Sequence, residues 1–170
     1  MIIMDQHAAH ERLKYEALKK ELETKQVTPQ ILMFPVICDL TPAEYVCYME
    51  NEQEIAEMGF ETESFGANSV LIRATPEAFD EDDLKQVFVE ILDNFAENKT
   101  SVITAKMERA LYTIACKAAV KANHKFDNGQ LEKLLKEVLA MKGINTCPHG
   151  RPIIITMTKK ELEKDFKRIL

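Results

Sequence analysis

The sequence predicts a mixed α/β (α+β) fold organised as two lobes. Its 170 residues are 46% hydrophobic, which is enough apolar material for one large core or two small ones. Segments with helical periodicity alternate with short β-branched segments. A middle block, residues 29–98, contains helices and a hairpin of its own. We therefore expect two lobes, with the middle block 29–98 as an α/β lobe in its own right.

The first part of the chain is predicted to be a helix followed by an extended segment. Apolar side chains recur at helical spacing over residues 8–23, at Leu13, Ala17, Leu18 and Leu22. Residues 27–39 contain Pro29 and Pro35 around an apolar run, which favours a linker that becomes an edge strand. Cys38 and Cys47 are expected to be small buried side chains.

The middle block begins with a well-marked helix. Thr41 is placed as its N-cap, with Pro42 at the first helical position and Glu44 three residues later, and Gly59 should end it. Residues 60–63 and 69–74 flank a Gly-Ala-Asn loop and predict a β-hairpin. An amphipathic helix is expected over 82–96.

The last third is predicted to contain three helices and one strand. The helices are expected over 104–121, over 130–141 with Gly143 as its end, and from the Thr158 and Glu161 capping box to Leu170. The β-branched run 153–156 indicates a buried strand.

Charge and cysteine content limit the function classes. A net charge of -6 and a pI near 5.3 argue against a free-standing nucleic-acid binder, so any DNA contact would need metal ions or another domain. No segment is long and apolar enough to cross a membrane or serve as a signal peptide. The four cysteines form no C-x-x-C pair, which favours a reducing, cytoplasmic setting.

Potential ligands gather in the first sixteen positions, at a predicted strand-to-helix junction: Asp5, His7, Glu11 and Glu16. His7 and Glu11 are four residues apart and share a helix face. Simpler roles stay open, because Asp5 could cap the helix and His7 could bond its backbone. His10 points to a different face and is expected at the surface.

Other potential ligands come from distant segments. Cys116 lies in an alanine-rich helix, and Cys147 and His149 lie in a turn closed by Gly150 and Pro152. Taken singly, Cys116 could be a core residue, and the turn could simply precede a buried strand. Together with the N-terminal residues they form a mixed soft and hard set that zinc accepts, and the carboxylates would also permit a harder ion of the kind that assists phosphodiester hydrolysis.

Three motifs resemble those of the C-terminal endonuclease region of MutL mismatch-repair proteins. The run from Asp5 to Ala8, with Glu11 and Glu16, matches D-Q-H-A-x-x-E-x-x-x-x-E. The segment 115–117 resembles the A-C-[RK] motif, and 147–152 resembles C-P-[HN]-G-R-P. The motifs occur in the family's order and extend over most of the chain.

The resemblance implies a latent endonuclease that nicks one strand of duplex DNA, is stimulated by Mn²⁺ (or Mg²⁺) and carries Zn²⁺ at or beside its active site. It implies that a discontinuous lobe built from 1–28 and 99–170 mediates dimerisation and that 29–98 is an inserted regulatory lobe. Its expected partners are a second copy, DNA, the replicative sliding clamp and, through the full-length protein, MutS, in a cytoplasmic, nucleoid-associated setting. The site residues it implies are Asp5, His7, Glu11 and Glu16 for catalysis, with Asp5 the catalytic carboxylate, and His7, Glu11, Cys116, Cys147 and His149 for zinc.

Residues 30–35 resemble the Q-x-x-[LI]-x-P peptide by which this family engages the sliding clamp. Gln30, Met33 and Pro35 are the expected contacts, with Met33 as an adaptable substitute for Leu or Ile. The alternative is an ordinary proline-bounded edge segment.

Other interpretations stay open. The chain could be a non-catalytic, zinc-stabilised dimerisation and clamp-binding module, whereas a metallopeptidase is disfavoured because the N-terminal run lacks the H-E-x-x-H order. Relatives have strands upstream of D-Q-H-A and an ATPase domain, so the chain is expected to be a fragment. Basic residues could contact DNA or form a solvated face: Lys117, Lys121, Arg151, Lys164, Lys167 and Arg168.

Overall fold

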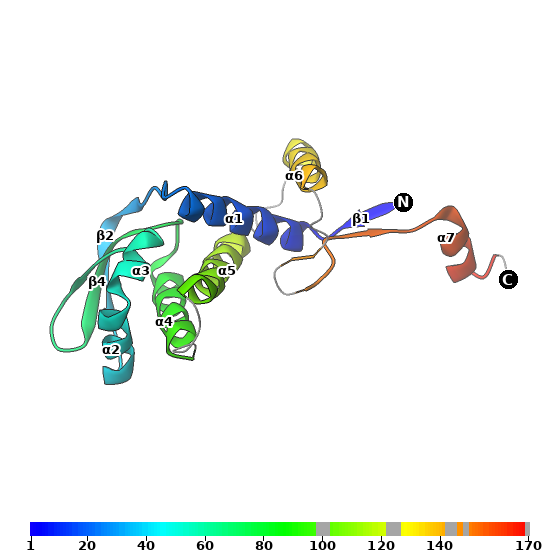
Figure 1. Ribbon diagram of the computed structural model, residues 1–170. Coiled ribbons are helices and arrows are strands. Elements are labelled where there is room, and N and C mark those ends of the chain that lie inside the picture. Colours follow the sequence, from blue (N-terminus) through cyan, green and yellow to red (C-terminus); the bar gives the residue numbers. More distant parts are fainter. Residues whose placement is uncertain (98–102, 122–126, 142–145, 148–149, 169–170) are drawn as a thin grey trace. The chain divides into compact units, whose positions relative to one another are not determined.

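The computed structural model describes residues 1–97, 103–121, 127–141, 146–147 and 150–168, which form helices and two antiparallel sheets (Figure 1). The predicted mixed α/β class is confirmed. The chain divides into two compact units, one made of Met1–Leu13 with His124–Leu170 and the other of Lys14–Asn123. The proposed lobe boundaries near residues 28 and 98 stay a prediction.

The first unit contains a two-stranded antiparallel sheet. Strand β1 (Ile2–Met4) pairs with β5 (Ile154–Thr156), and helix α1 (Gln6–Glu23) begins directly after β1. Helices α6 (Asn128–Ala140) and α7 (Lys159–Asp165) complete this unit. Its hydrophobic cluster joins α1, α6 and the segment before β5 through Ala8, Ala9, Leu134, Val138, Cys147 and Ile153.

The second unit is built around a three-stranded antiparallel sheet with the strand order β2-β4-β3. Its elements are β2 (Gln30–Asp39), α2 (Pro42–Glu50), α3 (Glu52–Glu57), β3 (Glu61–Ser64), β4 (Ser69–Thr75), α4 (Glu81–Glu97) and α5 (Ile103–Lys121). The buried face of α4 supplies Leu84, Val87, Phe88, Ile91, Leu92 and Phe95 to the core. The ring of Phe88 meets that of Phe60 edge-on, with centroids 5.8 Å apart.

The helix expected from Thr41 to Gly59 is instead two helices, α2 and α3, separated at Asn51. The Thr41 capping box is confirmed, since its hydroxyl accepts the Glu44 N–H while the Glu44 carboxylate accepts the Thr41 N–H. Asn51 breaks the helix because its side-chain amide donates to the Cys47 carbonyl at 2.7 Å, while its own backbone has φ -128°.

Gly59 ends α3, as predicted. Its N–H donates to the Ala56 carbonyl, and the Phe60 N–H donates to the Ile55 carbonyl, which is the Schellman pattern. Gly59 has φ +93°, and a Cβ atom built there would lie 2.5 Å from Cγ1 of Val27. The turn therefore requires glycine both for its backbone angle and for space.

Three expectations for the C-terminal segment need correction or fall outside the described residues. The strand at 153–156 was expected to be buried, but Ile153 alone is fully buried, and Ile155 is 47% exposed, because among the described residues only two strands form this sheet. The final helix ends at Asp165, before Lys167 with φ +54°, and not at Leu170. Helix α6 ends at Ala140, and Gly143 lies outside the described residues.

Strand β2 is an edge strand with a large irregular bulge. Ile31 pairs with Ala74 and Val36 with Ile72, so four residues of β2 stand opposite the single residue Arg73. Pro35, which has no N–H to donate, falls inside this bulge. Cys38 and Cys47 are buried as predicted.

The described helices include none with the length and apolar content needed to span a membrane.

Substitution of Gly59 tests the turn. We expect Gly59→Ala to lower the free energy of unfolding by about 3 kcal/mol, because it combines a positive φ with a steric clash. Gly66→Ala is the matched control, since Gly66 has φ +89° with nothing within 4 Å, and should cost about 1 kcal/mol. Urea denaturation monitored by circular dichroism measures both values, and equal losses would contradict the steric part of the argument.

Candidate metal centre

Asp5 connects the small sheet to helix α1. Its N–H donates to the Ile153 carbonyl at 2.9 Å, which extends the β1–β5 pairing by one residue. Its Oδ1 accepts the N–H groups of His7 at 2.9 Å and Ala8 at 3.1 Å. Asp5 is therefore the N-cap of α1, as the simpler of the two interpretations expected, and its position is fixed from both sides.

His7 and Glu11 form a pair on the first turns of α1. His7 Nε2 lies 3.0 Å from Glu11 Oε1, and the Glu11 side chain is only 6% exposed whereas that of His7 is 48% exposed. A buried carboxylate needs a hydrogen-bonding, charged or metal partner to offset its desolvation. The helical spacing thus aims an imidazole nitrogen and a buried carboxylate at the same point.

Cys147 lies in a tight turn that leads into β5. Its N–H donates to the Arg151 carbonyl, and its own carbonyl accepts the Gly150 N–H. Gly150 has φ +77°, which glycine adopts readily. The buried Cys147 side chain belongs to the same hydrophobic cluster as Ala8 and Ala9, which lie between His7 and Glu11 in the sequence.

The chain path explains why this turn and Asp5 are linked. Two residues after Arg151, the buried Ile153 offers the carbonyl that binds the Asp5 N–H. Sequence reasoning did not single out Ile153 as a positioning residue. No local motif identifies it, because its role depends on a backbone pairing between the two ends of the chain.

The remaining predicted ligands are divided. Glu16 is half-buried on α1 and Cys116 is half-buried on α5, and both belong to the unit Lys14–Asn123. His149 lies outside the described residues. His10 was expected at the surface and is half-buried. The structure thus brings Asp5, His7, Glu11 and Cys147 into one unit.

Within the described residues, no group of three or more His, Cys, Asp or Glu side chains is arranged to hold a metal ion. Two pockets, of about 540 and 450 Å³, lie in the unit Lys14–Asn123, and none of the six predicted catalytic and zinc residues that the structure describes lines them. The chemistry indicated by the ligand pattern is therefore separate from these pockets.

The donors of the first unit nonetheless suit zinc. His7 offers nitrogen, Glu11 offers oxygen and Cys147 offers sulfur, which are the three atom types found in zinc sites. A bound ion would require His7 Nε2 and Glu11 Oε1 to move apart slightly from their 3.0 Å separation, because ligand atoms at about 2.0 to 2.2 Å from a tetrahedral metal lie roughly 3.3 to 3.6 Å apart.

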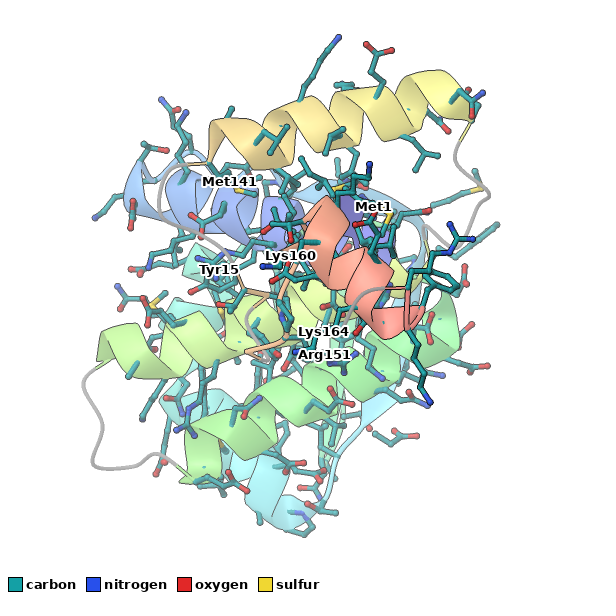
Figure 2. The ribbon with its side chains drawn as sticks, turned by 90° about the vertical axis from the view of Figure 1, so that its right-hand side faces the viewer. Met1, Tyr15, Met141, Arg151, Lys160 and Lys164 are labelled. Carbon is teal, nitrogen blue, oxygen red and sulfur yellow. The ribbon has the colours of Figure 1, made fainter. Side chains whose placement is uncertain are left out.

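Basic side chains lie exposed on the C-terminal segment of the same unit. Lys160 and Lys164 are four residues apart on α7, and Arg151 precedes β5 (Figure 2). In the other unit, Lys117 contacts Glu90 at 3.4 Å. The side chain of Lys121 is outside the described set, so contact of these residues with DNA stays a prediction.

The fold and site define a mixed α/β protein with a candidate metal centre at a strand-to-helix junction. Residues 1–126 match the family model described as the MutL C terminal dimerisation domain. The chain belongs to this MutL family. The matched range includes the segment from Asp5 to Glu16 as well as Cys116, but ends before the turn at Cys147.

Similar proteins extend the comparison to the C-terminal segment. The chain is 38% identical over 169 residues to the DNA mismatch repair protein MutL of Clostridium botulinum (strain Langeland), covering 99% of the chain and 25% of that protein. MutL of Clostridium acetobutylicum is 36% identical, with 99% and 27% covered. MutL of Caldanaerobacter subterraneus is 38% identical over 167 residues, with 98% and 28% covered. The chain thus spans about a quarter of the length of these relatives.

Proposed function

We propose that this chain acts in DNA mismatch repair as a metal-dependent endonuclease domain that nicks one strand of duplex DNA. The observation that supports this most strongly is the junction at the start of α1. There, a fixed Asp5 carboxylate lies two residues before His7, which is paired with the buried carboxylate of Glu11. Relatives named as mismatch repair proteins support the biological setting.

The proposed zinc ligands are His7, Glu11 and Cys147, with His149 as a fourth from the C-P-H motif. Cys116 stays a predicted ligand that the resemblance adds. Asp5 is the proposed carboxylate for Mn²⁺ or Mg²⁺, because a hard ion prefers oxygen ligands. The hydrogen bonds to the Asp5 side chain use Oδ1, which leaves Oδ2 in a fixed direction for an ion.

The chain's own residues would prepare the site for hydrolysis. Divalent ions bound there would supply positive charge that neutralises the phosphodiester and lowers the pKa of the attacking water. Asp5 would orient its ion through a carboxylate held by two backbone N–H groups. His7 and Glu11 would hold theirs with side chains that already meet, which reduces the entropy lost on binding. Glu16 is a further proposed catalytic carboxylate.

Removal of the Asp5 charge tests catalysis. With Mn²⁺ present, we expect the chain to nick supercoiled plasmid weakly. The nicking rate of Asp5→Asn should be lower by a factor of about one hundred or more. Asparagine is an effective N-cap, so the variant should keep its fold, as circular dichroism would check. Equal nicking by the two proteins would remove Asp5 from the proposed mechanism.

Zinc content provides a readout that does not depend on activity. We expect the purified chain to retain about one zinc ion, and Cys147→Ser to lose it, because a serine hydroxyl is a poor zinc ligand. Cys47→Ser is the control, since Cys47 is buried and its Sγ lies 3.4 Å from the Leu92 carbonyl oxygen, a contact that serine can keep. Elemental analysis by mass spectrometry measures the content, and full zinc in Cys147→Ser would exclude this ligand.

The bulge of β2 supports docking on a sliding clamp. The three predicted contacts, Gln30, Met33 and Pro35, are all exposed. Met33 is 87% exposed and its neighbour Phe34, which the motif did not identify, is 78% exposed. Met33, Phe34 and Pro35 lie in the bulge, where the chain leaves the ladder, and are accessible to a partner's pocket. Gln30, in contrast, is paired with Thr75 just before the bulge.

Truncation of Met33 tests this docking. We expect Met33→Ala to weaken binding of the chain to the replicative sliding clamp about tenfold, since the side chain would be buried in the complex. Val46→Ala is the matched control, because Val46 is a 55% exposed apolar residue on α2, outside the bulge. Surface plasmon resonance compares them, and an equal loss in both would argue against the bulge as the docking site.

Homodimer formation is also proposed, and the description of the matching family as a dimerisation domain supports it. The second candidate function is a non-catalytic, zinc-stabilised dimerisation and clamp-binding module. Glu16 and the intact D-Q-H-A-x-x-E run favour the catalytic proposal, because a purely structural zinc site would not need so many carboxylates. Interaction with MutS is proposed only for the full-length protein.

A further inference from the structure

The edge of β2 beyond the bulge offers unused backbone groups to a partner. In the stretch Val36–Asp39 the pairing with β4 is regular, from Val36 opposite Ile72 to Asp39 opposite Ser69. The Leu40 N–H donates to the Asn68 carbonyl on the β4 side. The direction of backbone hydrogen bonds alternates along a strand. The N–H and C=O groups of Cys38 therefore also point to β4, whereas those of Ile37 and Asp39 point to the opposite edge.

The pairing on the far side of β4 agrees with this alternation. The Phe65 N–H donates to the Ser69 carbonyl at 2.7 Å, so Ser69 faces β3. Its neighbour Val70 then faces β2, where it stands opposite Cys38. In the described part of the chain, β2 pairs with β4 alone. The outer edge of β2 therefore has no neighbouring strand among the described residues.

A groove runs beside this edge. It has a volume of about 450 Å³ and is bounded by β2 and α4, through Ile37, Cys38, Asp39, Lys85, Gln86, Val89 and Glu90. Ile37 is 42% exposed, and Val89 is half-buried, so apolar surface lies within the groove. Burial raises the pKa of the Cys38 thiol to about 11, so Cys38 serves as an apolar wall rather than a nucleophile.

The segment that contains the groove is strongly acidic, and the groove itself is lined by the carboxylates of Asp39 and Glu90 and by Lys85. Residues 29–98 contain sixteen Asp and Glu against two Lys and Arg, a net charge of -14, whereas the rest of the chain has twelve against twenty, a net charge of +8. The two cations of this segment are already paired, Lys85 with Glu81 at 2.7 Å and Arg73 with Glu63. From α5, Lys117 reaches the groove residues Glu90 at 3.4 Å and Gln86 at 3.5 Å, which leaves the Asp39 carboxylate of the lining without a basic partner among the described residues. On α4, burial and the neighbouring carboxylates of Glu44, Glu97 and Glu90 raise the pKa of Asp93.

We propose that an extended peptide with basic side chains binds here as a fourth strand, pairing with the outer edge of Val36–Asp39 and filling the groove against α4. Backbone groups of Ile37 and Asp39 supply the hydrogen bonds, and alternate side chains of the peptide enter the groove. The excess of carboxylates in this segment favours a basic peptide. A second copy of β2 is disfavoured as the occupant, because it would bring together two segments that each have a large excess of carboxylates.

Fluorescence anisotropy with two synthetic peptides tests the charge preference. A labelled peptide of alternating lysine and valine should bind the chain, and its affinity should fall as salt is raised. The matching peptide of alternating glutamate and valine should bind at least about tenfold more weakly. Equal binding of the two peptides, or binding of neither, overturns the proposal.

Two variants of Ile37 test the strand pairing. Ile37→Pro removes the outward N–H but no ladder bond to β4, so it should keep the fold and weaken the lysine peptide about tenfold or more. Ile37→Val keeps the N–H and should bind as the parent chain does. Unchanged binding of the lysine peptide by Ile37→Pro overturns the proposal. If Ile37→Pro instead keeps peptide binding but loses self-association of the chain, the occupant is a second copy and the proposal is also overturned.

Hydrogen exchange in the unmodified chain provides a measurement that needs no variant. The lysine peptide should slow exchange of the Ile37 and Asp39 amides, while the Cys38 amide, already bonded to β4, should change little. Protection of Cys38 alone, or of none of the three, contradicts strand addition.

Discussion

The candidate metal centre depends on the hydrogen bond from the Asp5 N–H to the Ile153 carbonyl. This bond joins residues almost 150 positions apart in the sequence and ends the pairing of β1 with β5 at the point where α1 begins. The same residue then caps α1 through its side chain. Backbone pairing thus determines where the helix starts, and the helix determines where His7 and Glu11 meet.

The turn that holds Cys147 is part of the same arrangement. Gly150 and the bond from the Cys147 N–H to the Arg151 carbonyl define the turn, and Ile153 follows it into the core. Cys147 thus belongs to the cluster of Ala8 and Ala9, and its backbone is held by hydrogen bonds to Gly150 and Arg151. A small two-stranded sheet can in this way align a thiol with a helix that begins at the other end of the chain.

Local patterns predicted those features that depend on neighbouring residues. The Thr41 capping box and the Gly59 terminus were found because each depends on a few adjacent positions. The break at Asn51 was missed, since a side-chain amide that replaces a helical hydrogen bond has no distinct spacing. The exposure of Ile155 was also missed, because burial of a strand depends on how many strands and helices surround it.

The candidate site was predictable in part for the same reason. The spacing of His7 and Glu11 implies a shared helix face, and their contact at 3.0 Å confirms this local expectation. The link between Asp5 and Ile153 could not be predicted from spacing, because strand pairing between chain ends leaves little trace in one sequence. The cluster that includes Cys147 and Ala8 likewise arises only when the chain has folded.

The bulge in β2 lies between residues that the core restricts and residues that it does not. Four residues stand opposite one, so the ladder from Val36 to Asp39 keeps its register whatever happens to the length of the intervening segment. An insertion or deletion there changes the exposed segment without turning any core side chain toward solvent. The fold itself therefore restricts the exposed segment little, so a restriction on its length or sequence would come from binding, whereas Val36 and Cys38 are restricted by the core.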